Sequence, residues 1–208
     1  MAFEALWYFT KMPKKIVDVL EEDLEVFEEE MKKSKVGVGE GKYLEDIRNS
    51  NNSWIPTDHW ISGFIWHYVQ KANRENFVYD ISSIDSETLQ FAKYNVGEFY
   101  GWHHDEGLSS SYKPEPTVTK DSNLNIDNYL KIKCQLVRKL SVSLLLSDPE
   151  EYEGGNLELK SLDGELFIAP RIRGTICIFD SRTLHRVQPV TKGVRKSLVA
   201  WIVGPRWK

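Results

Sequence analysis

Residues 174–203 read GTICIFDSRTLHRVQPVTKGVRKSLVAWIV and consist of short apolar runs separated by turn residues. Runs of this kind, bounded by glycine and polar residues, are typical of β-strands. The spacing predicts strands over residues 174–179, 184–190 and 195–203, with a turn at Lys192-Gly193. This part of the chain therefore indicates a core built from β-sheet.

The same pattern of short apolar runs separated by turn residues extends back along the chain to residue 77. Further candidate strands cover residues 77–81, 88–95, 98–104, 139–147, 155–159 and 165–169. Many short strands at roughly ten-residue spacing are typical of a β-sandwich or jelly roll. We therefore expect a mainly β fold.

Two helices are predicted before these strands. In residues 14–33, apolar side chains recur every three or four positions, and Glu and Lys occupy the other face. A second helix is predicted from an N-cap at Thr57 to about Ala72. Because both helices precede the strands, we expect them to pack on one outer face of a sheet.

The chain length of 208 residues suits one domain with a substantial core. We expect residues 1–208 to form that domain, with residues 1–76 as helical support and residues 77–208 as the jelly-roll core. Residues 106–137 interrupt the strand pattern with a long polar segment. We interpret this segment as a flap over a functional site, with a short helix near residues 126–134.

Composition excludes several classes of protein. Apolar residues make up 41% of the chain, and the net charge is −4, so neither disorder nor a general attraction to nucleic acid is expected. No apolar run is long enough for a membrane-spanning helix, so no membrane partner is expected. The two cysteines, Cys134 and Cys177, form no disulfide framework, which favours a cytoplasmic location.

Of five histidines, two lie in the segment Gly101-Trp-His-His-Asp105. If this segment ends a strand, alternate side chains share a face, so His103 and Asp105 point together and His104 points away. One imidazole and one carboxylate on the same face can supply two ligands to a metal. Taken alone, the pair is equally compatible with a surface histidine beside an aspartate.

His185 is the remaining histidine of the strand-rich half and would supply a third ligand. Two histidines and one carboxylate on one side of an iron leave three positions open, which is the facial triad of non-haem Fe(II) oxygenases. A structural zinc site would instead use four protein ligands, often cysteines. Taken alone, His185 could equally be a buried structural histidine.

Arg195 follows ten residues after His185, at the start of an otherwise apolar strand. Strand alternation places Arg195 and Ser197 on one face. An inward guanidinium is costly unless it binds an anion, and its planar fork suits a carboxylate, with the Ser197 hydroxyl as a further donor. The alternative is an edge-strand arginine that lies in solvent.

Together these motifs resemble the Fe(II)/2-oxoglutarate-dependent dioxygenases, in particular the prolyl 4-hydroxylase-like branch with its bacterial and viral members. The resemblance covers about Leu89 to Trp201. It is carried by Tyr94-x-x-Gly97-x-x-Tyr100-x-x-His103-x-Asp105, by Arg138-Lys-Leu-Ser-Val-Ser143, by Gly154-Gly155-Asn-Leu157, and by His185-Arg-Val-x-Pro-Val190-x-x-Gly193-x-Arg195-x-Ser197.

The resemblance implies a double-stranded β-helix, a jelly roll with N-terminal helices, which agrees with the strand count. It implies that His103, Asp105 and His185 bind Fe(II), and that O2 is used to hydroxylate a C–H bond. A peptidyl proline is the expected target, so a peptide or protein is the expected partner. Nothing in the sequence indicates the oligomeric state.

The resemblance also implies 2-oxoglutarate as cosubstrate. Arg195 would hold its C5 carboxylate and complete the catalytic set, with Ser197 assisting. Tyr94 matches a tyrosine that hydrogen-bonds the same cosubstrate. Ascorbate is a further cofactor that the resemblance suggests.

Three alternatives remain open at this stage. The same chemistry could act on a free amino acid or another small molecule, or on a nucleobase. The short spacing from His185 to Arg195 and the negative net charge argue against a nucleobase. The third alternative is a catalytically silent jelly-roll binding protein, against which the intact set of ligands argues.

Overall fold

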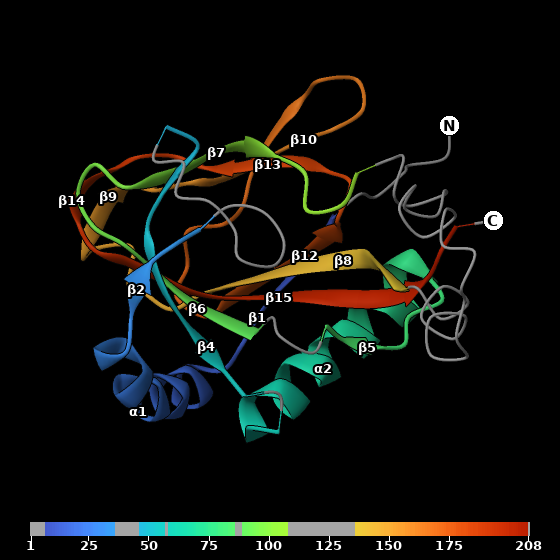
Figure 1. Cartoon of the computed structure of the whole chain (residues 1–208), viewed down its shortest axis with the longest axis horizontal. Coiled ribbons are helices and arrows are strands. Elements are labelled where there is room, and N and C mark those ends of the chain that lie inside the picture. Colours follow the sequence, from blue (N-terminus) through green and yellow to red (C-terminus); the bar gives the residue numbers. More distant parts are fainter. Residues whose placement is uncertain (1–6, 36–45, 57, 86–88, 108–135, 208) are drawn as a thin grey trace, which may run out of the picture.

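Two β-sheets lie face to face in the computed structural model, which describes residues 7–35, 46–56, 58–85, 89–107 and 136–207 (Figure 1). The larger sheet has eight strands in the order β1-β12-β8-β15-β6-β4-β2, with β5 paired to β15. Its strands are β1 (Trp7–Lys11), β2 (Lys32–Lys33), β4 (Asn51–Ile55), β5 (Ser83–Ile84), β6 (Leu89–Tyr94), β8 (Leu136–Leu145), β12 (Thr175–Asp180) and β15 (Arg195–Pro205).

The smaller sheet has five strands in the order β11-β10-β13-β7-β3. Its strands are β3 (Arg48–Asn49), β7 (Phe99–His103), β10 (Leu157–Lys160), β11 (Leu166–Ile168) and β13 (Leu184–Val187), and a separate pair joins β9 (Tyr152–Gly154) to β14 (Val190–Gly193). The pairings in both sheets are antiparallel. The predicted mainly β jelly roll is therefore confirmed.

Two α-helices cover the outer face of the larger sheet (Figure 1). They are α1 (Lys14–Glu29) and α2 (Trp60–Ala72), and a π-helical turn, η1 (Asn73–Phe77), continues α2. Buried residues of both helices, such as Leu20 and Ile65, join one apolar cluster with the larger sheet. The prediction that the helices pack on one outer sheet face is confirmed.

Side-chain alternation on β15 separates the two faces of the larger sheet. Leu198, Ala200 and Ile202 point into the apolar cluster beneath the helices. Ser197 and Trp201 point the other way and line a cavity between the sheets. Because side chains alternate along a strand, one face of β15 packs in the apolar core and the other lines the cavity.

Several predicted element boundaries are wrong. The helix predicted over residues 14–33 ends at Glu29, and Lys32–Lys33 instead pairs with β4 as strand β2. The strand predicted over residues 77–81 is absent from this described segment. Residue 77 ends the π-helical turn, and Val78 has a left-handed φ of 55°, which breaks an extended run.

The predicted division of the chain also needs correction. Residues 1–76, expected to be helical support, contain strands β1 to β4, which join both sheets. Residues 136–137, assigned to the flap, begin strand β8. Most of the flap, the helix predicted near residues 126–134 and the N-cap predicted at Thr57 lie outside the described residues. Within the described chain, no helix combines the length and apolarity needed to span a membrane.

Candidate metal centre

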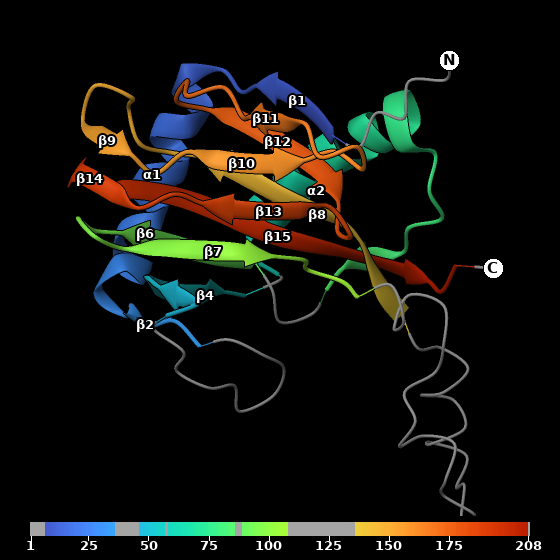
Figure 2. The ribbon, with the colours of Figure 1, turned by 90° about the horizontal axis from the view of Figure 1, so that it is seen from above.

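The pairing of β7 with β13 brings the first and last predicted ligands together. His103 and His185 are direct partners across this strand pair, which Figure 2 shows side by side in front of β15. Asp105 follows two residues after His103, on the same side of the chain. One ligand atom from each of the three residues lies within 4.8 Å of the others. The strand pairing thus brings together His103 and His185, which are 82 positions apart in the sequence.

Hydrogen bonds to the backbone fix which nitrogen of each imidazole can bind a metal. Nδ1 of His103 lies 2.8 Å from the carbonyl oxygen of Gly101, and Nδ1 of His185 lies 2.9 Å from that of Thr183. Since a carbonyl oxygen only accepts, each Nδ1 donates, and each Nε2 keeps its lone pair in the neutral ring. These atoms lie 3.6 Å and 3.4 Å from the two carboxylate oxygens of Asp105.

The carboxylate of Asp105 is held by groups from the larger sheet. The hydroxyl of Ser141 on β8 donates to Oδ2 of Asp105 at 2.7 Å and contacts the hydroxyl of Ser181 at 2.9 Å. The backbone nitrogen of Asp105 donates to the carbonyl oxygen of Ser181 at 3.0 Å. The ligand that follows β7 is therefore positioned by both sheets.

Burial and neighbouring charges prepare the ligands for a cation. Burial, and after it the neighbouring His185, lower the pKa of His103 to about 3, so His103 is neutral at pH 7. Burial alone would raise the pKa of Asp105, but His185, His103 and the Ser141 hydroxyl outweigh it and lower that pKa. A neutral His103 imidazole beside an ionised, buried carboxylate is a combination of protonation states that metal binding requires.

We expect Ser141→Ala to weaken metal binding by about tenfold, because the Asp105 carboxylate loses the donor that orients it. Competition with a chromophoric chelator, with Mn(II) and no cosubstrate, measures the affinity. Ser143→Ala is the matched control, since Ser143 lies on the same face of β8, two residues further along. Equal affinities of the Ser141 and Ser143 variants would contradict this role.

The low pKa of His103 also predicts acid sensitivity of the metal-free protein. Between pH 6.5, the ordinary value, and about 3, the unfolded chain binds a proton at His103 that the folded protein excludes. The free energy of unfolding should therefore fall as the pH falls through this window. Urea titrations with chelator present should give a flatter pH profile for His103→Gln than for the unsubstituted protein, and equal profiles would contradict this prediction.

A cavity of about 450 Å³ opens beside the three ligands, between the sheets. The Tyr100 ring stacks on His103 with centroids 3.5 Å apart, and Phe179 meets His185 edge-on at 4.7 Å. Trp201 lines the cavity from β15. These rings wall the candidate metal centre with apolar surface, which limits the access of water.

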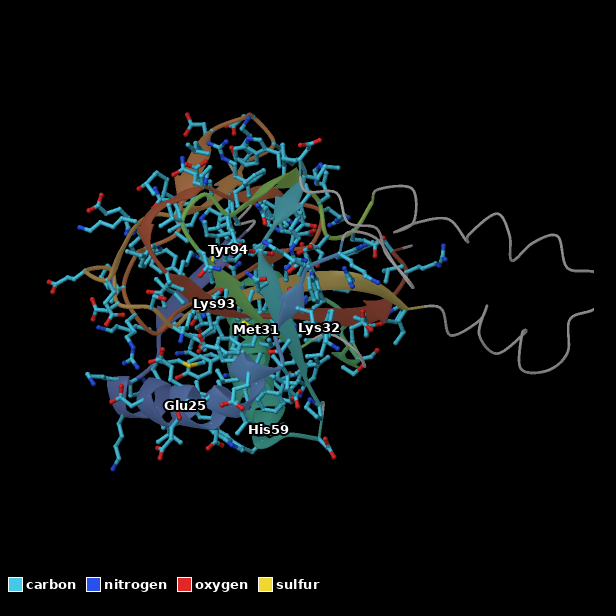
Figure 3. The ribbon with its side chains drawn as sticks, turned by 60° about the vertical axis from the view of Figure 1, so that its left-hand side comes forward. Glu25, Met31, Lys32, His59, Lys93 and Tyr94 are labelled. Carbon is cyan, nitrogen blue, oxygen red and sulfur yellow. The ribbon has the colours of Figure 1, made fainter. Side chains whose placement is uncertain are left out.

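The predicted carboxylate clamp lies beside this cavity, which Tyr94 and Ser197 line. Arg195 and Tyr94 are direct partners across β15 and β6, and the Arg195 guanidinium carbon lies 5.4 Å from the Tyr94 ring centre. Nη1 of Arg195 donates to the Ser197 hydroxyl at 2.9 Å. In Figure 3, Tyr94 lies on the side of β6 that faces away from α1. Glu25 is labelled there on α1. The structure thus brings all three predicted cosubstrate residues together.

Sequence reasoning missed Arg48, a cavity residue from the short strand β3. The side chain is 7% exposed, and its Nη2 donates to Oε1 of Gln90 at 2.7 Å. Its guanidinium lies 4.7 Å from the centre of the Tyr100 ring, which stacks on His103. Arg48 therefore helps to fix the aromatic wall. A lone arginine in a polar segment carries no sequence signal that would have found it.

The remaining histidines lie apart from the metal centre. His104, predicted to point away, is exposed, and its Nδ1 lies 2.7 Å from the Arg182 carbonyl oxygen. His59 caps α2, because its Nδ1 accepts from the Ile61 nitrogen at 3.4 Å, and Figure 3 shows it with the helices. His67 is an exposed residue of α2.

Comparison with known proteins identifies relatives of this arrangement. The family model described as "2OG-Fe(II) oxygenase superfamily" matches residues 89–203. A PKHD-type hydroxylase of Synechococcus sp. (strain JA-2-3B'a(2-13)) is 34% identical over 156 residues, which cover 73% of this chain and 59% of that protein. The chain thus spans less than two thirds of the length of these curated relatives.

Solved structures share the fold. A prolyl-4-hydroxylase from Pseudomonas putida superposes with a TM-score of 0.64 at 19% identity, over 97% of this chain and 94% of that one. A prolyl hydroxylase from Trichoplax adhaerens, in complex with a hypoxia inducible factor peptide fragment, gives a TM-score of 0.67 at 17% identity, over 96% and 84%. At these identities, the likeness establishes the jelly-roll fold.

Proposed function

Since this chain belongs to the 2OG-Fe(II) oxygenase superfamily, we propose that it is an Fe(II)- and 2-oxoglutarate-dependent dioxygenase that hydroxylates a C–H bond of a peptidyl proline. The observation that carries the proposal is the convergence of His103, Asp105 and His185 beside a cavity that adjoins a second one, which the buried Arg195 lines. This arrangement argues against a catalytically silent binding protein.

The residues of the centre fit Fe(II). Two Nε2 lone pairs and a buried carboxylate form the two-histidine, one-carboxylate donor set of non-haem iron oxygenases. Bound Fe(II) would supply the activation of O2 and the oxidative decarboxylation of 2-oxoglutarate. The chain itself holds the ligand orientation through Ser141 and the Gly101 and Thr183 carbonyl groups.

The cosubstrate would be held by Arg195, with Ser197 and Tyr94 beside it. Arg195 is 3% exposed, and none of the ion pairs among the described residues involves it. A buried, unneutralised guanidinium is costly by itself and is stabilised by a carboxylate. The distal carboxylate of 2-oxoglutarate would supply that charge.

A peptide substrate is supported by the names of the relatives, which include PKHD-type hydroxylases and a prolyl hydroxylase solved with a peptide fragment. On the cavity wall, Trp201 offers an apolar ring, and Arg138 packs its guanidinium 4.4 Å from the centre of that ring. The part of this ring that faces the cavity would offer apolar surface to a proline ring.

Succinate release and mass spectrometry test the proposal. The protein is incubated with Fe(II), 2-oxoglutarate and a library of proline-containing peptides, and each peptide is examined for the mass of one added oxygen atom. The expected result is succinate formation that depends on Fe(II) and is coupled to hydroxylation of a proline. If succinate formation is coupled to hydroxylation of free proline alone, the substrate is an amino acid and not a peptide. If no succinate forms under any condition, the proposal is refuted.

Other features stay predictions. Ascorbate as an accessory reductant and the absence of a nucleic-acid partner are inferred from the resemblance and from the charge of −4. A cytoplasmic location is supported by the sparse cysteines, of which Cys177 is buried and free. We also propose that residues 1–208 act as one catalytic domain. This is supported by β1 to β4, which pair in the same two sheets as strands from residues 77–208.

A further inference from the structure

A second cavity, of about 300 Å³, adjoins the one beside the metal centre and holds two guanidinium groups. One belongs to Arg195 and the other to Arg171, in the segment between β11 and β12. Tyr152 lies between them. Its ring centre is 4.5 Å from the Arg171 guanidinium carbon, and its hydroxyl hydrogen-bonds the Arg195 guanidinium. The two arginines are therefore built into one wall.

Nothing in the described chain neutralises these two charges. None of the ion pairs between described residues involves Arg171 or Arg195. Arg171 donates from Nη2 to the Tyr152 carbonyl oxygen at 2.8 Å, but its Nε is buried without a hydrogen-bond partner there. Two like charges in one cavity, with an unsatisfied buried donor, are stabilised by an anion.

The two cavities share lining residues, and Arg195 of one donates a hydrogen bond to Ser197 of the other, so the arginines lie next to the cavity that holds the metal ligands. Ser143 and Leu157 line both. Gly155 leaves room for the Arg195 side chain, because a Cβ there would lie 3.0 Å from Cδ of Arg195 and 3.0 Å from a methyl carbon of Val190. A dicarboxylate with one end at the metal would therefore place its other end among the guanidinium groups.

We propose that Arg171 is a second guanidinium of the distal-carboxylate subsite and makes the site selective for dianionic 2-oxo acids. Arg195 alone would satisfy one carboxylate edge, whereas Arg171, which lies over the ring of the same Tyr152 that Arg195 hydrogen-bonds, adds a second guanidinium donor. The inference rests on the proposed function, since it assigns a residue to binding of the same cosubstrate. It concerns binding, not the chemical step.

Binding measured without turnover tests the proposal. Isothermal titration calorimetry is performed without O2 on the Mn(II)-loaded protein, with 2-oxoglutarate and with monoanionic 2-oxopentanoate, which has the same chain length but no distal carboxylate. Arg171→Gln is expected to weaken 2-oxoglutarate binding about tenfold, the usual effect of losing a charge-assisted hydrogen bond. Binding of 2-oxopentanoate should stay within about twofold, since it has no group for Arg171.

Arg173→Gln is the matched control, because Arg173 lies two residues along the same segment but pairs with Asp18 and Glu21 of α1. It should leave the preference for 2-oxoglutarate unchanged. Arg171→Lys keeps the charge without the planar fork and should lose less affinity than Arg171→Gln. Thermal unfolding of each variant shows whether it is folded. If Arg171→Gln does not fold, Arg171→Lys is used instead to compare the binding of the two acids.

The outcomes separate the two proposals. Unchanged 2-oxoglutarate affinity in Arg171→Gln would overturn the role of Arg171. An equal loss for both acids would also overturn it, because a purely structural role predicts that result. Failure of the wild-type protein to bind 2-oxoglutarate at all would instead refute the proposed function.

Discussion

Asp105→Ala is expected to lower 2-oxoglutarate turnover by roughly 10³-fold or more while the fold stays intact. The carboxylate lies 3.6 Å and 3.4 Å from the two imidazole nitrogens, so its removal takes away the only negative charge of the ligand set. His103→Ala should also lower turnover strongly, since it removes one of the three metal ligands. Succinate release with Fe(II) in excess is the measurement.

The fold of these variants can be checked separately from their activity. Metal affinity should fall together with turnover, whereas the near-ultraviolet circular dichroism spectrum should be retained. Asp163→Ala is the control, because Asp163 is an exposed carboxylate in the turn between β10 and β11. Succinate release at the wild-type rate by Asp105→Ala would refute the assignment of the metal centre.

Arg195→Ala is expected to raise the KM for 2-oxoglutarate by about 100-fold with little change in metal affinity. The guanidinium is 3% exposed and has no carboxylate partner among the described residues, so its loss removes a desolvated charge that the cosubstrate would pair with. Initial rates over a range of 2-oxoglutarate concentrations, with a separate Mn(II) titration, distinguish the two effects.

The neighbouring residue provides a matched control for this experiment. Lys196 lies on the opposite face of β15 and pairs with Glu28 of α1, so Lys196→Ala should leave the KM unchanged. Arg195→Lys should recover only part of the affinity, because an ammonium group lacks the planar fork. An unchanged KM in Arg195→Ala would show that the cosubstrate carboxylate is bound elsewhere.

The parts of the fold that sequence could predict are those with a clear period. Alternation along residues 195–203 placed Arg195 and Ser197 on one face, and the structure puts both beside Tyr94. The same rule placed His103 and Asp105 together and turned His104 away. The partnership of His103 with His185 could be inferred only from chemistry, since strand pairing is set by the tertiary fold.

The parts that sequence missed lack such a period. Strands β3 and β4 lie within Arg48-Asn-Ser-Asn-Asn-Ser-Trp-Ile55, whose polar side chains read as loop, and β4 becomes a strand because it pairs with β6. Ser141 looks like any strand serine until its bond to Asp105 is seen. Arg171 lies between strands, in a segment without a regular pattern, so the sequence carries no signal for its place beside Arg195.

The position of β15 has a consequence for biosynthesis. This strand is the last described one along the chain, yet it lies between β8 and β6 in the middle of the larger sheet. During translation, the facing edges of β8 and β6 therefore stay unpaired until residues 195–205 leave the ribosome. Unpaired strand edges invite aggregation, so the nascent chain is most vulnerable just before its synthesis reaches β15.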